Sequence, residues 1–255
     1  MGVRENGTWG GPSDQDVVET ALAATIEVHA QDGLGSGFVV EQRGLAVTAR
    51  HVVDEGGRSA REVTVRVFLA GGQTRDTTAV VFNSHRYLDY ALLWLAEPGP
   101  YPTLSLGNPG GLRHTDVVFA LGSPSGLSKT ASRGIVSNPR AAMQGIEYIQ
   151  TDAAISGGNS GGPLIDRTGH AMGINVLGLR SESGSVDAAH FAVPLDYLWS
   201  DIKRAWERGR EACINAPYCR SCGHTEYTEP TWYCRACGLK TSDPELDGQQ
   251  MRGGL

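Results

Sequence analysis

The feature that most constrains the fold is a long succession of short apolar runs, each ended by a turn signal, between about residues 17 and 195. Runs such as "GSGFVV", "EVTVRVFLA" and "DVVFALG" have the length and the β-branched or aromatic content of single strands. Glycine contributes 34 of the 255 residues, roughly twice the average share, which suits a chain with many tight turns. Many short strands separated by Gly and Pro predict an all-β protein built as a sandwich or barrel.

The pattern changes after Pro194. In "LDYLWSDIKRAWERGR", residues 195–210, apolar side chains return at helical spacing and predict an amphipathic helix that closes the domain. Those apolar residues are Leu195, Leu198, Ile202, Ala205 and Trp206. We therefore expect four parts along the chain: a flexible N-terminus (1–16), a main domain (17–212), a small cysteine-bearing unit (217–239) and a disordered tail (240–255).

Composition excludes several classes of protein. A net charge of −6 argues against a general nucleic-acid binder, because phosphate binding needs clustered Lys and Arg. No stretch approaches the ~18–20 apolar residues of a membrane span, and no apolar run follows a basic start, as it would in a secretory signal. All five cysteines lie from Cys213 onward, which favours a metal site in a reducing cytoplasm over a disulfide framework.

The segment "TDAAISGGNSGGPLID", residues 151–166, carries the first candidate for chemistry. A serine hydroxyl is a weak nucleophile until a base takes its proton and donors stabilise the resulting oxyanion. Glycines permit the backbone angles that point successive N–H groups into one small space. The N–H groups of Gly158 and Ser160 are the candidate oxyanion-hole donors, with Asn159 bending the loop between them. Similar short sequences also occur in loops with no catalytic role, so this segment alone leaves open whether it is such a loop or one that holds a nucleophilic serine.

A base and an orienting acid must come from other segments. His51 follows the apolar segment "GLAVTAR", so it lies where a buried strand emerges, although a histidine at a strand end can also be purely structural. Asp89 directly precedes the apolar run "YALLWLA". A carboxylate next to a buried strand needs a charged or hydrogen-bonding partner to offset the cost of its burial. The candidate triad in chain order is His51, Asp89 and Ser160.

These segments resemble a known family. "GLAVTARHVVD" (44–54), "LDYALLWL" (88–95) and the serine segment resemble the histidine, aspartate and serine segments of trypsin-like serine peptidases of the HtrA type. The resemblance covers about residues 34–200 in the family's order. It implies two six-stranded, chymotrypsin-like β-barrels with the active site between them. It further implies cleavage of protein or peptide substrates through an acyl-enzyme on Ser160.

The resemblance also bears on specificity. In related enzymes that cut after Lys or Arg, an acid lies six residues before the serine, whereas this chain has Ala154, followed by Ile155. Asn175 and His190 could reach the pocket walls. We expect a small or medium apolar side chain in the pocket, and His190 leaves a polar or acidic one as the alternative.

The cysteine-bearing unit reads "YCRSCGHTEYTEPTWYCRACG" and resembles a zinc ribbon. Two C-x-x-C pairs, eleven residues apart, supply four candidate ligands: Cys219, Cys222, Cys234 and Cys237. Four thiolates can close a tetrahedral structural Zn²⁺ site, and metal binding would supply the folding energy of so small a unit. Two redox-active pairs are the alternative; Cys213 is expected to be a buried helix residue.

HtrA proteins usually carry a PDZ domain after the protease and a signal or anchor before it, and in this sequence the ribbon follows the protease instead. That departure leaves the family's trimer in doubt and the oligomeric state open. Three basic against two acidic residues between 217 and 240 give little basis for nucleic-acid binding, so a protein contact, through Trp232 or Tyr233, is favoured. The main interpretation is a cytoplasmic serine endopeptidase whose ribbon recruits a partner or substrate. The alternative is a catalytically silent or partner-gated protease-fold scaffold or binding protein.

Overall fold

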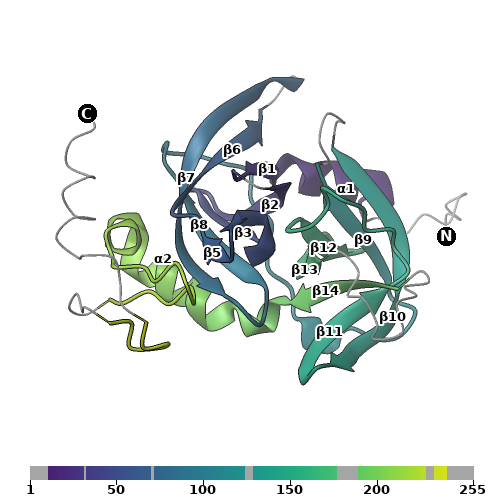
Figure 1. The fold of residues 1–255 in the computed structure, drawn as a ribbon. Coiled ribbons are helices and arrows are strands. Elements are labelled where there is room, and N and C mark those ends of the chain that lie inside the picture. The colour runs from purple at the N-terminus through teal and green to yellow at the C-terminus, as the bar shows by residue number, and fades with distance from the viewer. Residues whose placement is uncertain are drawn as a thin grey trace, which may run out of the picture.

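The computed structural model describes residues 11–31, 33–69, 72–123, 129–176, 189–227 and 233–239. Two antiparallel β-barrels, each closed by six strands, lie side by side, and helix α2 (Trp199–Ile214) passes along the first of them (Figure 1). This is the chymotrypsin-like, all-β arrangement with a C-terminal helix that the sequence predicts. The expected tail, residues 240–255, lies outside the described residues.

The first barrel has the strand order β1-β2-β3-β8-β7-β6. A short 3₁₀ helix, η1 (Arg50–Val53), and a small hairpin, β4 (Asp54–Glu55) with β5 (Arg58–Ser59), connect β3 to β6. The barrel strands are β1 (Thr25–His29), β2 (Leu34–Glu41), β3 (Leu45–Thr48), β6 (Glu62–Phe68), β7 (Thr74–His85) and β8 (Tyr90–Leu95).

The second barrel has the order β10-β11-β14-β13-β12-β9, and the loop between β11 and β12 contains the serine segment. Two further 3₁₀ turns, η3 (Pro109–Gly111) and η4 (Leu195–Tyr197), flank this barrel. Its strands are β9 (Val117–Gly122), β10 (Thr130–Met143), β11 (Ile146–Thr151), β12 (Pro163–Asp166), β13 (Ala171–Val176) and β14 (His190–Pro194).

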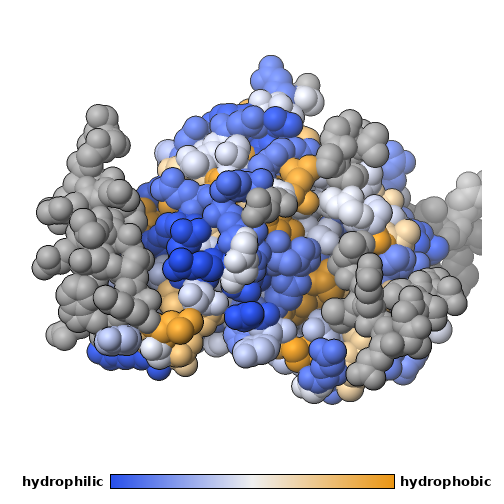
Figure 2. Space-filling model, in the orientation of Figure 1, coloured by the Kyte–Doolittle hydropathy of each residue, from blue (hydrophilic) through white to orange (hydrophobic). Residues whose placement is uncertain are grey.

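Burial follows the strand pattern of the sequence. Strand β6 alternates between exposed or half-exposed and buried residues, as a strand with one face to solvent must, whereas the apolar run of β8 is buried throughout. Trp94, Phe38 and Phe82 are among the largest fully buried side chains. Hydrophilic side chains cover most of the first barrel's face seen in Figure 2, with hydrophobic groups visible in small patches. The apolar segments of the sequence therefore form the barrel cores.

Helix α1 (Asp14–Ala23) begins within residues 1–16, the segment that the sequence predicts to be flexible. Ser13 and Asp16 form a reciprocal capping box: the Ser13 hydroxyl accepts the Asp16 N–H at 3.2 Å, and the Asp16 carboxylate accepts the Ser13 N–H at 2.9 Å. Val17 and Ala21 are buried. The cap and this small apolar face start the helix at Asp14; residues 1–10 lie outside the described part of the chain.

Helix α2 differs in detail from its predicted pattern. Ile202, Ala205 and Cys213 are buried, but Trp206 is 59% exposed. Trp206 lies at the edge of the buried face, one turn after Ile202, and Trp199 lies along the same edge. Gly209, with φ +75°, interrupts the helical backbone. None of the described helices is long and apolar enough to cross a membrane.

Candidate active site and metal site

His51 and Asp89 come together from two segments of the first barrel. His51 lies in η1, and Asp89 lies in the turn between β7 and β8. The carboxylate binds the histidine twice: Oδ2 lies 2.7 Å from ring Nδ1, and Oδ1 accepts the His51 backbone N–H at 2.9 Å. The backbone carbonyl of Asp89 also accepts the N–H of Arg50 at 3.2 Å. This grip places a proton on Nδ1 and leaves Nε2 of the neutral ring as the base.

The surroundings of His51 suit a base that must also hold a proton. Burial lowers the pKa of the ring, but the hydrogen bond and charge of Asp89, together with the charge of Asp54, outweigh it and raise the pKa above 6.5. The side chain is nevertheless 46% exposed. The ring is therefore bound by the Asp89 carboxylate through Nδ1 and is still partly open to a substrate.

Ser160, from the second barrel, lies close to the segment that carries His51. Its backbone carbonyl accepts the N–H of Ser36, in β2 of the first barrel, at 2.8 Å. A Cβ atom at Gly35 would lie 2.5 Å from the Val52 side chain and 2.8 Å from the Ser160 carbonyl oxygen. Ser160 and the residue that follows His51 thus pack on the same glycine. Within the described chain, Ser160 Oγ makes no hydrogen bond to the ring, and such bonds are often long until substrate binds.

A buried serine fixes the peptide between Gly158 and Asn159 in the oxyanion loop. The Ser36 hydroxyl donates to the Gly158 carbonyl at 2.5 Å and accepts the Ser123 N–H at 2.8 Å. Because the Gly158 carbonyl is occupied in this way, the adjacent peptide cannot turn freely. Ser36 cannot be recognised from the sequence, because it is a single polar residue in a strand and its partner in the chain is 122 residues away.

Two N–H groups of the loop stay available. The N–H of Asn159 donates to the Ser156 carbonyl at 3.0 Å, and the Asn159 side-chain oxygen accepts the Thr130 hydroxyl at 3.0 Å. The N–H groups of Gly158 and Ser160 donate to no group in the described residues. Gly158 has a φ of +99°, the left-handed region that glycine favours. These are the two donors that the sequence assigns to an oxyanion hole, with Asn159 as the tethered residue between them.

The first two pocket candidates divide between surface and core. Ala154, the residue six positions before the serine, is exposed on the loop. Ile155 is buried and packs in the core cluster of the second barrel. The position that is acidic in enzymes that cut after Lys or Arg is therefore an alanine in this chain.

The other two pocket candidates lie on neighbouring strands. Asn175, in β13, is fully buried, and its amide nitrogen donates to the carbonyls of Leu121 and Pro163 at 3.0 and 3.1 Å. His190, in β14, is half-buried and pairs with Thr151 across the sheet. Asn175 Oδ1 and His190 Nδ1 are buried without a partner among the described residues. Each side chain therefore has one buried polar atom that no described group satisfies.

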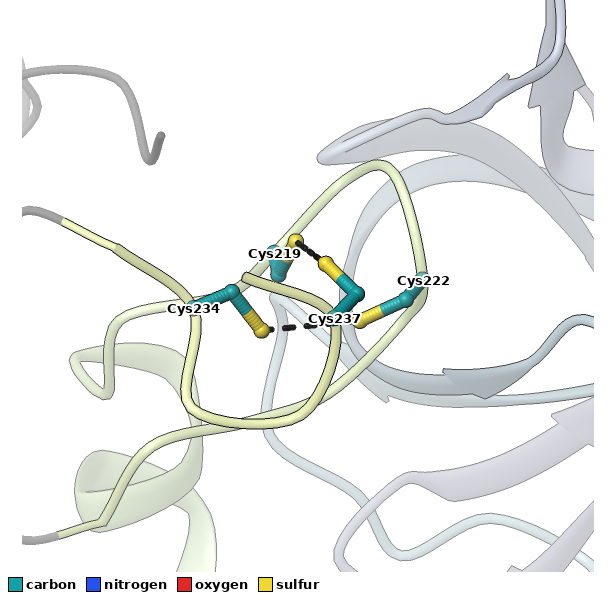
Figure 3. A group of neighbouring side chains, drawn as sticks. All are labelled: Cys219, Cys222, Cys234 and Cys237. Carbon is teal, nitrogen blue, oxygen red and sulfur yellow. Dashed lines mark hydrogen bonds between the residues drawn. The ribbon is translucent and has the colours of Figure 1, made fainter. Parts of the chain in front are cut away.

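The four cysteines of the C-terminal unit converge from two loops (Figure 3). Their sulfur atoms all lie within 4.8 Å of one another. Cys219 Sγ lies 3.8 Å from Cys237 Sγ, and Cys222 Sγ lies 3.6 Å from Cys234 Sγ. In each loop the N–H of a glycine with positive φ donates to the carbonyl of the first cysteine, Gly223 to Cys219 and Gly238 to Cys234. Four thiols in this arrangement can bind a metal ion.

Two closed barrels, with a histidine–aspartate pair on one and a serine loop on the other, define the class of chymotrypsin-like serine peptidases. The trypsin-like peptidase domain matches residues 35–174, more than half of the chain, and the protein belongs to this family. It is 40% identical over 207 residues to the mitochondrial serine protease HTRA2 of Bos taurus, covering 74% of this chain and 42% of that protein. The magnetosome formation protease MamE of Paramagnetospirillum magneticum is 39% identical over 176 residues, which cover 67% of this chain and 23% of MamE.

Solved structures give the same relationship. The HtrA-type protease AlgW, with a tripeptide, superposes with a TM-score of 0.65 at 31% identity, covering 78% of this chain and 65% of that one. A serine endoprotease from Yersinia pestis superposes with a TM-score of 0.62 at 29% identity, covering 78% of this chain and 69% of that one. The matched region spans only about 40% of the length of the HTRA2 proteins, such as that of Drosophila pseudoobscura.

Proposed function

We propose that this protein is a serine endopeptidase that cleaves proteins or peptides through an acyl-enzyme on Ser160. The observation that carries the proposal is the pairing of His51 with Asp89, opposite a serine loop that keeps the N–H groups of Gly158 and Ser160 available. A scaffold with no turnover has no need for either feature.

The geometry supports the following chemistry. Ser160 Oγ attacks the scissile carbonyl carbon while its proton passes to Nε2 of His51, and the carbonyl oxygen becomes an oxyanion bound by the N–H groups of Gly158 and Ser160. Asp89 stays ionised and stabilises the imidazolium. When the intermediate collapses, the C–N bond breaks and His51 protonates the leaving amine. Water then attacks the ester by the same route and releases the acid.

The substrate we propose has a small or medium apolar side chain at the cleaved position. Ala154 and Ile155 supply no negative charge to balance a bound Lys or Arg. The unpartnered polar atoms of Asn175 and His190 support the alternative, a polar or acidic side chain. The tripeptide in the AlgW structure supports peptides as the substrate class.

We propose that the metal is a structural Zn²⁺ ion held by Cys219, Cys222, Cys234 and Cys237. Zn–S bonds of about 2.3 Å in a tetrahedron place sulfurs about 3.8 Å apart. The observed separations of 3.8 and 3.6 Å fit that arrangement. Four thiolates close the coordination sphere, so the ion would stabilise the fold and supply no catalytic water. Five free thiols support a reducing compartment, and we place the protein in the cytoplasm.

We propose that the ribbon, residues 217–239, also binds a protein partner or substrate. A cavity of about 570 Å³ lies where the ribbon meets helix α2 and the β7–β8 turn. Tyr87, which is 77% exposed, and Leu239 line it, and Arg86 and His224 add polar contacts. An aromatic group beside polar ones in a concave site is suited to a peptide segment.

Cleavage-site profiling tests the function directly. Wild-type protein and Ser160→Ala are incubated with a broad peptide library and labelled with a fluorophosphonate probe. We expect labelling and cleavage by the wild type, with both lost in the variant. Equal labelling of the two would overturn the proposal. Labelling of the wild type without cleavage, with cleavage appearing when a binding partner is added, would favour the partner-gated alternative.

A further inference from the structure

The first metal-binding loop of the ribbon, which we call the first knuckle (Cys219–Gly223), packs between the segment that follows His51 and the segment that precedes Asp89. One of these segments is the β4–β5 hairpin, which begins at Asp54 directly after η1. The other is the end of β7, which leads into the turn of Asp89. The proposed mechanism assigns this loop no role.

Arg220 joins the knuckle to the hairpin through both backbone and side chain. Its carbonyl accepts the Ser59 N–H at 2.8 Å, and its Nε donates to the Ser59 carbonyl at 2.7 Å. Its Nη2 donates to the Glu55 carboxylate at 3.0 Å. Three bonds from one residue fix the hairpin that follows the catalytic histidine.

Gly223 joins the knuckle to strand β7. Its carbonyl accepts the Ser84 N–H at 3.0 Å, and a Cβ atom on it would lie only 2.0 Å from the Ser84 carbonyl oxygen. The adjacent His85 accepts the Leu88 N–H on its Nδ1 at 3.1 Å, so the ordered contacts continue to the residue before Asp89. Only glycine allows this close approach.

A buried chain of hydroxyl groups connects the two segments behind the knuckle. Ser59 Oγ lies 3.1 Å from Ser84 Oγ, and the Tyr218 hydroxyl lies 2.9 Å from the same Ser84 oxygen. Ser59 and Ser84 are both buried. The hairpin, the strand and the ribbon therefore share one hydrogen-bonded junction.

We propose that the metal-loaded first knuckle is a positioning element for the catalytic pair, with Arg220 and Gly223 as its positioning residues. The inference rests on the proposed peptidase function. Cys219 and Cys222 belong to this knuckle, and a bound ion ties them to Cys234 and Cys237 of the second loop. Loss of the ion frees the knuckle, and the two segments that it joins then lose their common support.

The test uses the full chain and compares Arg220→Ala with Arg208→Ala. Arg208 stacks over Tyr227, with its guanidinium 4.4 Å from the ring centre. It therefore contacts the ribbon at a point away from the hairpin and the end of β7. Small displacements of a catalytic group cost up to about 100-fold in rate, so we expect about a 10-fold loss of kcat for Arg220→Ala, with KM within about twofold. Arg208→Ala should keep the wild-type kcat. Arg220→Lys should recover part of the loss, because it keeps a donor for Glu55 or Ser59.

A second readout does not depend on turnover. The Nδ1 proton of His51, bonded to Asp89, gives a far-downfield proton NMR signal that broadens when the bond opens. We record it in Ser160→Ala protein before and after removal of zinc by a chelator. We expect broadening on zinc removal and in the Arg220→Ala background, and recovery when zinc is returned. This readout separates the two proposals, because it succeeds even if the protein cleaves nothing.

Two results would overturn the inference. One is a sharp, unchanged His51 signal in zinc-free protein whose barrels remain folded by circular dichroism. The other is a folded Arg220→Ala variant with wild-type kcat and an unchanged pH profile. A lower melting temperature with neither effect would show a purely structural ribbon and would count against positioning.

Discussion

The carboxylate of Asp89 binds His51 at two points, the ring Nδ1 at 2.7 Å and the backbone N–H at 2.9 Å. Asp89 adopts a φ of +52°, a left-handed conformation that short polar side chains tolerate better than most. The turn is thus shaped to aim both carboxylate oxygens at one residue. Two contacts fix the ring in position and in tautomer, which a single hydrogen bond does less well.

Replacing Asp89 with Asn tests that dual role. The amide can still accept from the backbone N–H, so the fold should be kept. Its NH₂ group, however, donates to Nδ1 and moves the ring proton to Nε2, which then cannot act as a base. We expect kcat to fall by about 10⁴-fold with little change in melting temperature. Asp76→Asn, at an ion pair with Arg66 on the same barrel, is the matched control and should retain activity. Comparable losses in both variants would contradict the assigned role.

The pH dependence of activity follows from the raised pKa of His51. The base works only when neutral, so kcat/KM should fall as the pH drops through a value above the ordinary 6.5. Asp54 contributes part of that shift through its charge. Asp54→Asn should therefore move the acid limb of the profile to lower pH. The measurement is kcat/KM against pH for both proteins; an acid limb that moves upward, or not at all, would contradict the assignment.

The sequence predicted the barrels and the candidate triad because both depend on local patterns. Strand runs, turn glycines and the segments around His51, Asp89 and Ser160 can each be recognised over a few residues. The fold class and the family are confirmed. The roles of the individual site residues stay predictions that the geometry supports.

The rest depended on contacts between distant parts of the chain. Nothing in "GSGFVV" shows that Ser36 bonds to residue 158, and nothing in "YCRSCG" shows that Arg220 reaches Glu55. Helical spacing placed Trp206 on the buried face, but the neighbouring elements decide how wide that face is, and Trp206 is exposed. Periodicity gives the orientation of a helix and leaves its packing partners undetermined.

Ser36→Ala tests whether the buried hydroxyl holds the oxyanion loop. The change leaves the Gly158 carbonyl and the Ser123 N–H without their partner, which should cost about 1–3 kcal/mol of unfolding free energy. A freer Gly158 peptide should also lower kcat while KM changes little, because the oxyanion exists only along the reaction path. Denaturant unfolding and steady-state kinetics measure the two effects. Thr168→Ala, at an exposed turn of the second barrel, is the control. A destabilised variant with wild-type kcat would separate Ser36 from the loop's function.

Alanine substitutions at Gly161, in the serine loop, and at Gly57, in the β4–β5 turn, distinguish the effect of steric crowding from that of backbone strain. Both have positive φ, +85° and +83°, but a Cβ at Gly161 would lie 2.2 Å from the Ser36 carbonyl oxygen, whereas one at Gly57 would meet nothing within 4 Å. Gly57→Ala should cost only the left-handed strain, about 1–2 kcal/mol, and leave activity intact. Gly161→Ala adds a clash that the Ser36 backbone, paired with Ser160, cannot relieve without moving the nucleophile. We expect it to abolish fluorophosphonate labelling and to lower the melting temperature further than Gly57→Ala does. Labelling of Gly161→Ala at the wild-type rate would show that the loop tolerates movement at this point and that its tight packing is not required for catalysis.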